Sequence, residues 1–414
     1  MLMSTRERTE LLGIGFGPSN LALAIAAAER GMRAVFVEAQ PTFGWHRGML
    51  LPGARMQIPF LKDLVTLRNA TSDYTFINYL SERGRLVEFI DRHTLFPSRV
   101  EFHDYLEWAA DRVAADVRYG HRVVEVSCGE PGFVVRADPE WVVEAHTLVL
   151  GTGLRPVLPG GVAESARQWH SHSLLNGLAA LNCASPQRFA VVGAGQSAAE
   201  VVGYLHETYP QAQVHGVFAR YGYSVVDDSP YVNRIFAPSA VDDFYGANQS
   251  ARQRLLDYHR SANYSAVDPE LIDDLYSREY AERVAGRRRL FMHNASEVAG
   301  TQEYPDRVRL TIANLANHST ETLDCAAVVY ATGYAPTDVR RFLGEVANRY
   351  EFDRDQRPVV SRDYRLVPKP GAPGDVYLNG SVEHTHGLAS SLLSNVAVRA
   401  HDIVSAVAAR QGAR

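Results

Sequence analysis

Apolar and polar positions near the N-terminus follow the order strand, turn, helix, strand. A short apolar run ends at Leu12, and after a glycine-rich turn an apolar helical stretch continues to about Arg30. Gly31 can end that helix, because glycine readily adopts the left-handed conformation found after the last helical turn. A second apolar run covers residues 34–37. The pattern predicts a β-α-β unit.

The turn of this unit carries the residues of a dinucleotide fingerprint. Gly13, Gly15 and Gly17 precede Pro18, which suits a first helical position because its missing N–H costs nothing there. The glycines let the backbone approach a pyrophosphate, and the helix N-terminus favours its negative charge. Glu38, after the second strand, can accept both ribose hydroxyls. The alternative is a plain β-α-β unit with a glycine turn.

A second unit of the same kind begins in the middle of the chain. Gly193, Gly195 and Ala198 fit G-x-G-x-x-A between an apolar run and a helical stretch. The strand that follows, residues 214–218, leads to Arg220 and not to an acidic residue. An arginine can pair with the 2′-phosphate of NADPH, whereas a carboxylate would repel it. We therefore predict an NADPH site with Arg220 as its clamp; the alternative is an exposed loop arginine.

Two apolar stretches with Thr-Gly after the strand, residues 146–159 and 326–338, mark the domain boundaries. Such strands are typical of two-dinucleotide flavoproteins, where the chain crosses between domains. We predict an α/β fold with two Rossmann-like domains and a mainly helical insert over the substrate, since a polar segment of this length exceeds an ordinary loop. The predicted parts are an FAD domain of residues 1–163 and 326–414, an NADPH domain of residues 164–325 and, within it, the insert of residues 228–282.

Composition narrows the class of protein. Of 414 residues, 46% are hydrophobic and 21% charged, and the formal net charge of −5 offers no basic surface for a nucleic acid. No apolar run is long enough to span a bilayer, and the first ten residues lack the apolar core of a signal peptide. Cys128, Cys183 and Cys325 form no C-x-x-C pair, which argues against a redox dithiol or a thiolate zinc site. We expect reduced thiols in a cytoplasmic protein without a nucleic-acid or membrane partner.

Eight motifs occur in order along nearly the whole chain. They are GIGFGPSNLALA, MQIPFLKDLVTLRN, FPSRVEFHDYLEWAA, VVGAGQSAAE, DDSPYVNRIF, NYSAVD, YATGY and EHTHGLASSLLSN. Together they resemble the flavin-dependent N-hydroxylating monooxygenases that act on the terminal amine of L-ornithine or L-lysine in siderophore and related biosynthesis. The run DLVTLRN, with Arg68 and Asn69, is more similar to the ornithine enzymes. Pro59 departs from the small polar residue that the family usually has there.

The resemblance implies FAD- and NADPH-dependent N-hydroxylation of the side-chain amine of L-ornithine by O2, through a C4a-hydroperoxyflavin. L-Lysine and a diamine such as putrescine are alternative substrates, and a flavin- and NADP-binding redox sensor is the non-enzymatic alternative. A Baeyer–Villiger or sulfur-oxidising monooxygenase would carry an F-x-G-x-x-x-H type signature, which we do not find between the two nucleotide folds. The resemblance also implies a homo-oligomer, a dimer or a tetramer.

One lysine stands among residues that avoid water. Lys62 lies in the run Phe60–Leu64, where a lysine is costly unless an anion meets it. The resemblance supplies that anion, the carboxylate of the amino acid; the alternative is a lysine whose ammonium reaches solvent. Asn233 and Asn263 match family positions at the substrate backbone, and the resemblance also implies that Asn263 lies near the nicotinamide ribose. Loop asparagines alternatively serve only as turn formers.

The remaining candidates are grouped by their partner. Leu392 and Ser394 match positions near the reacting amine and the flavin; their alternative role is a helix start that packs on the core. The candidate substrate-binding residues are Lys62, Asn233, Asn263, Leu392 and Ser394. The candidate FAD-binding residues are Gly13, Gly15, Gly17, Pro18, Glu38, Trp45, His46, Gln57 and Leu393. The candidate NADPH-binding residues are Gly193, Gly195, Gln196, Ser197, Arg220 and Asn263, and the candidate catalytic residues are Gln57 and Asn263.

Two histidines in EHTHGL raise the question of a metal. His384 and His386 have no third ligand at a recognisable spacing, so we predict no metal site. We expect this loop to lead into a helix whose N-terminus faces the flavin pyrimidine edge. No residue stands out in the sequence as a general base for the amine proton.

Overall fold

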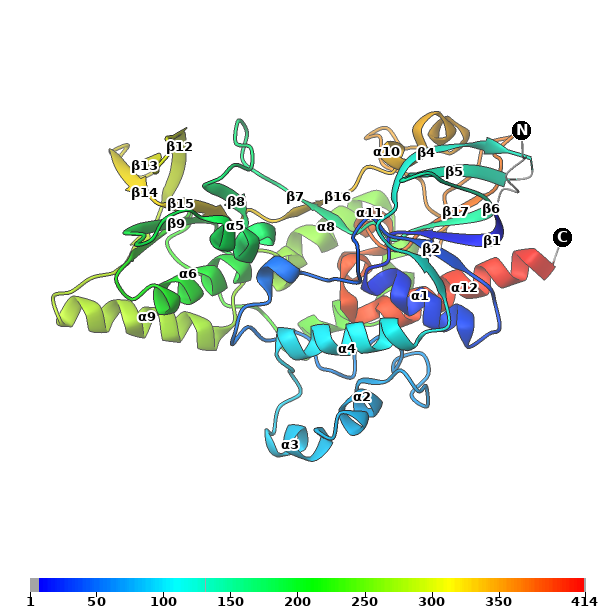
Figure 1. The fold of residues 1–414 in the computed structure, drawn as a ribbon, viewed down its shortest axis with the longest axis horizontal. Coiled ribbons are helices and arrows are strands. Elements are labelled where there is room, and N and C mark those ends of the chain that lie inside the picture. Colours follow the sequence, from blue (N-terminus) through cyan, green and yellow to red (C-terminus); the bar gives the residue numbers. More distant parts are fainter. Residues whose placement is uncertain (1–6, 131, 413–414) are drawn as a thin grey trace.

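The first sheet is built around β1 (Glu7–Ile14). The computed structural model describes residues 7–130 and 132–412, and Figure 1 shows them as two lobes, each built on a sheet. In the first lobe β1 pairs in parallel with β2 (Val35–Val37) and β6 (Trp141–Leu150). Strand β1 ends two residues later than the apolar run predicts, because its last four residues are all buried between β2 and β6.

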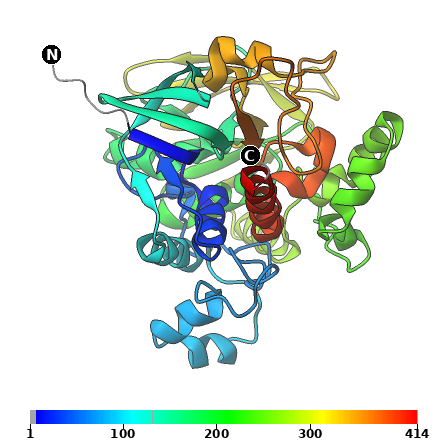
Figure 2. The same ribbon diagram turned by 90° about the vertical axis from the view of Figure 1, so that its right-hand side faces the viewer.

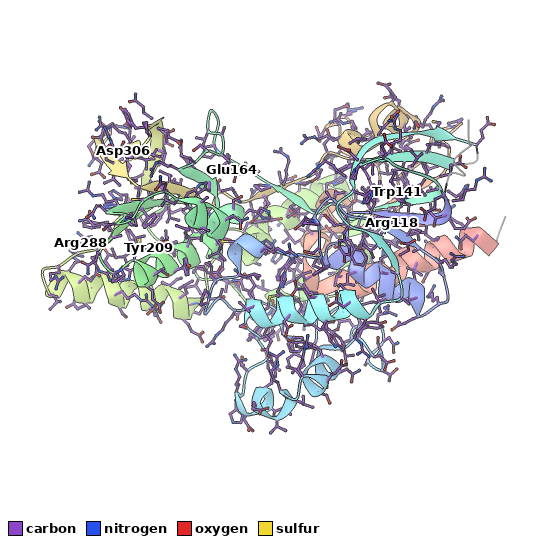
Figure 3. All side chains as sticks on the ribbon, in the orientation of Figure 1. Arg118, Trp141, Glu164, Tyr209, Arg288 and Asp306 are labelled. Carbon is purple, nitrogen blue, oxygen red and sulfur yellow. The ribbon has the colours of Figure 1, made fainter. Side chains whose placement is uncertain are left out.

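The other strands extend this sheet on both sides. They are β3 (Asp116–Arg118) beside β2, β5 (Gly132–Asp138) and β4 (Arg122–Gly129) beyond β6, and β17 (Asp375–Leu378), which pairs in parallel with β6. Trp141 Nε1 donates to Glu7 at 2.9 Å, and Arg118 lies 3.5 Å from the same carboxylate, so one side chain of β1 ties three strands together (Figure 3).

Two long helices cover one face of the first sheet. They are α1 (Pro18–Ala28) and α12 (Val396–Gly412), which pack side by side (Figure 1). Alanines occupy much of α1, and its residues from Asn20 to Ala27 are buried, so no polar face is required. Small side chains let the two helices approach closely. The C-terminal part of the chain thereby returns to the first glycine turn.

The second lobe is a five-stranded parallel sheet. Its order is β11 (Leu290–His293), β10 (Gln213–Val217), β9 (Arg188–Val192), β15 (Ala327–Tyr330) and β8 (Gln168–His170). Because β15 pairs with both β9 and β8, the expected start of the returning FAD domain at residue 326 is wrong, and the second sheet extends to Tyr330. Helices α5 (Leu174–Ala180) and α6 (Gln196–Thr208) follow β8 and β9.

The insert in the second domain is shorter than the predicted range of residues 228–282. Helix α9 (Pro269–Val284) connects β10 to the parallel strand β11 and packs against α6 through Leu275 and Leu271. It is therefore the crossover helix of the second domain and not part of a substrate cover. The true insert holds α7 (Ala240–Gly246) and α8 (Gln249–His259), which Figure 2 shows in green to one side of α12.

Two small antiparallel structures complete the lobes. One is the three-stranded sheet of β12 (Ser296–Glu303), β13 (Val308–Asn314) and β14 (Thr320–Cys325). The other is the ribbon of β7 (Leu154–Pro156) and β16 (Tyr334–Pro336), each of which follows one of the Thr-Gly stretches. The two chain crossings between the lobes are thus hydrogen-bonded to each other.

An aromatic subdomain lies below the first sheet in Figure 1. It contains α2 (Phe76–Glu82), α3 (Leu86–Asp91) and α4 (Arg99–Arg112), and Ser98 caps α4 by accepting the Glu101 N–H at 3.0 Å. Short segments such as α10 (Arg340–Leu343) and α11 (Glu383–His386) lie in the C-terminal part. Among the described residues, no helix is long and apolar enough to cross a membrane.

We expect the pair Arg99–Glu200 to fasten the two lobes. Arg99 of α4 donates twice to Glu200 of α6, at 2.9 and 2.8 Å, and the two side chains are only 14% and 5% exposed. Removing one partner strands a buried charge, so Arg99→Met should lower the free energy of unfolding by about 3 kcal/mol or more. Urea titration measures this, and the double variant with Glu200→Met should recover part of the loss. Equal losses in the single and double variants would contradict the interpretation.

Candidate functional site

One large cavity lies between the two lobes. Its volume is about 2520 Å³, and both glycine turns, the insert and the start of the C-terminal region line it. Single-ligand pockets are usually about 300–1,000 Å³. The cavity is therefore large enough for several small molecules at once, and it lies where the carboxyl ends of the two parallel sheets face each other.

The first glycine turn is fixed by backbone geometry and by one carboxylate. Gly15 has φ +85°, and a Cβ there would lie 2.7 Å from the Gly151 carbonyl oxygen. The Phe16 N–H donates to Glu38 Oε2 at 2.7 Å. A Cβ on Gly17 would meet no atom within 4 Å, because the residue faces the open cavity. An open, glycine-lined turn at the N-terminus of α1 fits the pyrophosphate of FAD.

Gly13 has a different role from the one predicted. It lies inside β1 and does not line the cavity. A Cβ at Gly13 would lie 2.2 Å from the Phe36 ring, so the absence of a side chain lets β1 and β2 pack closely. This correction reflects the later end of the strand.

The second glycine turn repeats the arrangement. Gly193 has φ +140°, and a Cβ there would lie 2.4 Å from the Ala331 carbonyl oxygen. Gly195, Gln196 and Ser197 line the cavity at the N-terminus of α6. The helix N-terminus and the bare backbone fit the pyrophosphate of a second dinucleotide.

A chain of hydrogen bonds joins Gln57, in the FAD domain, to the second glycine turn. Gln57 Nε2 donates to Asp268 Oδ1 at 3.2 Å, and Gln196 Nε2 donates to Asp268 Oδ2 at 2.9 Å. Gln196 also donates to Glu200 at 3.1 Å, and Glu200 is paired with Arg99. Gln57, predicted at the flavin, is thus positioned by a residue of the NADPH domain.

Arg220 lies outside the cavity. Its guanidinium is exposed and donates to the Ser265 carbonyl oxygen at 3.1 Å, and Ser265 itself lines the cavity. The side chain follows β10, beside the second glycine turn. The structure therefore places Arg220 at the rim, and its proposed contact with a 2′-phosphate stays a prediction.

The substrate candidates come together although they are far apart in sequence. Lys62, Asn233, Asn263, Leu392 and Ser394 all line the same cavity. Lys62 is half-buried, and burial lowers its pKa. No described carboxylate forms an ion pair with it. The chain has forty arginines but two lysines, Lys62 and the exposed Lys369.

The segment before α12 presents polar atoms without partners. Ser394 is 3% exposed and lines the cavity, and its Oγ has no hydrogen-bond partner among the described residues. The next residue, Asn395, is 4% exposed, and both of its amide atoms are also unpartnered there. Buried polar atoms are rarely left unsatisfied, so this segment fits a polar ligand.

A carboxyl–phenol pair that sequence reasoning missed lies beside Asn263. Tyr264 donates its hydroxyl to Glu383 Oε2 at 2.5 Å, and both residues line the cavity. Burial raises the pKa of Glu383. Glu383 is the first residue of the motif EHTHGL, in which only the two histidines were considered from the sequence.

The two histidines of that motif are occupied by protein partners. His384 Nε2 hydrogen-bonds the Pro358 carbonyl oxygen at 2.9 Å. His386 stacks on Tyr364 with ring centroids 4.2 Å apart, and burial lowers its pKa to about 3. The described residues hold no group of three potential metal ligands.

Trp45 and His46 lie on the cavity wall near the ribbon between the lobes. Their rings are 4.8 Å apart, and His46 lies 6.0 Å from the Tyr334 ring of β16. Burial, with Arg99 and His172 nearby, lowers the pKa of His46 to about 3. It is neutral at physiological pH and packs against the crossing strands. With Leu393 and the residues above, every predicted site residue except Gly13 and Arg220 lines this cavity.

Two dinucleotide-binding folds that share one cleft define the class of two-dinucleotide flavoprotein oxidoreductases. Residues 7–336 match the model of the L-lysine 6-monooxygenase/L-ornithine 5-monooxygenase family. The chain belongs to that family, and the resemblance noted in its motifs is confirmed.

Three relatives show how close the likeness is. The chain is 41% identical to an L-ornithine N(5)-monooxygenase of Burkholderia cepacia, over 91% of this chain and 89% of the relative. An ornithine N-hydroxylase of Kutzneria sp. 744, described with reduced FAD, NADP+ and L-ornithine, superposes with a TM-score of 0.94 at 44% identity, over 98% and 100% of the two chains. The ornithine hydroxylase of Pseudomonas aeruginosa gives 0.91 at 32% identity, over 98% and 100%.

We expect Arg220 to set the preference for NADPH. Arg220→Ala removes a charge-assisted contact, so the apparent Kd for NADPH should rise by roughly 10-fold or more, while that for NADH stays nearly constant. Anaerobic flavin reduction, followed by stopped-flow absorbance, measures both. Arg287→Ala, an exposed arginine outside the cavity, is the control. An equal loss with both coenzymes would exclude a 2′-phosphate contact.

Proposed function

We propose that this protein hydroxylates the side-chain amine of L-ornithine, using FAD, NADPH and O2. The observation that carries the proposal is Lys62, a half-buried ammonium without an anionic partner among the described residues, on the wall of the cavity that both dinucleotide folds share. The relatives' names support ornithine as the substrate.

The substrate would be held at its amino-acid end. Lys62 Nζ pairs with the carboxylate, and Asn233 and Asn263 bind the α-amino and carboxylate groups, since a neutral amide can both donate and accept. Asn233 is itself held by its Nδ2 donation to the Asp228 carbonyl oxygen at 2.6 Å. Holding one end fixes the distance to the other, so the length of the side chain decides where the terminal amine lies.

FAD, when bound, supplies the activated oxygen, and NADPH supplies the hydride that reduces the flavin. The chain's own residues would bind the substrate, shield the reacting atoms from water and remove a proton from the amine. The insert around Asn233 lines the same cavity as Lys62 and would help to exclude water. The amine must lose a proton before it reacts, and Glu383, with its raised pKa, is the cavity carboxyl suited to take that proton at Oε1 while Oε2 holds the Tyr264 hydroxyl. Gln57 and Asn263 would hold NADP+ and the flavin in register.

We further propose a cytoplasmic, homo-oligomeric protein. The cysteines are unpaired, which suits a cytoplasmic protein. A homo-oligomer is supported by the apolar side chains exposed on the α2–α3 protrusion, which Figure 2 shows below the body: Val87 is 68% and Ile90 60% exposed. Siderophore or related biosynthesis is the proposed context.

A coupled assay tests the function directly. Addition of L-ornithine to the FAD-loaded protein should couple NADPH oxidation and O2 consumption to hydroxylamine formation, with L-lysine and putrescine much poorer. One methylene is worth only about 1–3 kcal/mol in a pocket, so lysine discrimination of roughly 10- to 100-fold is expected. A redox sensor would give neither turnover nor hydroxylamine, and better turnover with putrescine would contradict the carboxylate contact.

Lys62 can be tested against the chain's other lysine. Lys62→Ala removes the proposed charge-assisted contact and should raise the KM for L-ornithine by roughly 10- to 100-fold, leaving anaerobic flavin reduction nearly unchanged. Steady-state hydroxylation and stopped-flow reduction measure the two effects. Lys369→Ala, which changes an exposed lysine, should alter neither. Slower flavin reduction with an unchanged KM would refute the assigned role.

A further inference from the structure

A second cation is more deeply buried than Lys62, and it also lacks an anion. Arg399 of α12 is 2% exposed. It donates from Nε to Asn379 Oδ1 at 3.0 Å, from Nη1 to the Ser390 carbonyl oxygen at 2.6 Å and from Nη2 to Ser19 Oγ at 3.2 Å. All these partners are neutral. Asp402, three residues further along α12, is already paired with Arg362 at 3.1 Å.

An isolated buried guanidinium is costly. Hydrogen bonds to neutral groups satisfy its N–H donors but do not neutralise its charge, and charges inside proteins are normally paired. Arg399 forms no ion pair among the described residues, and its titratable neighbours there, Tyr364 and His386, carry no negative charge in their ordinary neutral forms. The charge therefore points to an anion that is not part of the chain.

The contacts of Arg399 lead to the first glycine turn. Ser19 is the second residue of α1 and lines the cavity. Asn379 donates to the Ser19 carbonyl oxygen at 2.8 Å and to Asn20 Oδ1 at 3.0 Å, and Asn20 donates to the Gly15 carbonyl oxygen at 2.7 Å. An unbroken hydrogen-bonded path thus runs from the guanidinium to the turn that fits the FAD pyrophosphate.

We propose that Arg399 is a positioning residue that stabilises the FAD diphosphate electrostatically from behind the N-terminus of α1. It does not touch the cofactor; it adds a full positive charge to the partial charge of the helix N-terminus, inside a region where water does not screen it. Its hydrogen-bonded path through Asn379 and Asn20 also holds the glycine turn in place. The C-terminal helix thereby becomes part of the FAD site.

The test compares flavins with and without a diphosphate. Apo-protein is titrated with FAD and with riboflavin, and flavin fluorescence gives both dissociation constants. Arg399→Gln keeps an amide donor and removes the charge, so it should weaken FAD binding by roughly 10- to 100-fold and riboflavin binding by less than about threefold. Arg399→Lys keeps the charge, and its ratio of FAD to riboflavin affinity should stay within about threefold of wild type. Arg410→Gln, at the other end of α12, is the control.

The outcomes separate charge from structure. Equal weakening of FAD and riboflavin by Arg399→Gln, or a wild-type FAD affinity, would overturn the proposal. If the Gln variant does not fold, the Lys variant decides alone: a fall of more than tenfold in its FAD-to-riboflavin ratio overturns the proposal, and a retained ratio supports it. These readouts are independent of substrate identity, so they stand whatever the coupled assay with ornithine shows.

Discussion

The structure depends on a single electrostatic constraint: cations held away from water must find anions. Lys62 and Arg399 both lie at or behind the cavity wall without an anionic partner among the described residues. The chain can tolerate them because ligands would bring the missing charges, a carboxylate for Lys62 and a diphosphate near Arg399.

The rest of the fold fixes the positions of Lys62 and Arg399 relative to the cavity. Both sheets present their carboxyl ends to the same cavity, and the crossing strands β7 and β16 pair so that the lobes share a hydrogen-bonded connection. The path from Arg99 through Glu200, Gln196 and Asp268 to Gln57 is a second connection between the lobes. A cavity between lobes that are connected twice can hold two cofactors and a substrate in a fixed geometry, as oxygen transfer to one terminal atom requires.

Much of this could be predicted from sequence, because the determining patterns are local. Both glycine turns, Glu38 and the cavity positions of Lys62, Asn233 and Ser394 follow from short motifs. The predictions that were wrong depend on how strands pair with each other in the folded chain. The apolar run at residue 327 does not reveal which sheet it joins, and α9 could be recognised as a crossover helix only once β11 was known to lie parallel to β10. Gly13 was misjudged because the end of β1 depends on its buried neighbours.

The groups that sequence reasoning missed are also products of tertiary structure. Glu383 becomes chemically distinctive only because it is buried and accepts the Tyr264 hydroxyl. The sequence of α12 does not show that Arg399 is buried without an anionic partner. A carboxylate or guanidinium has no unusual property in sequence. Its environment gives it one.

The most direct measurement is a crystal structure of the FAD-loaded protein with L-ornithine bound. We predict that Lys62 Nζ lies about 2.7–3.0 Å from a carboxylate oxygen of the amino acid, with the terminal amine directed toward the flavin. A carboxylate bound elsewhere, with Lys62 extended into bulk solvent, would contradict it.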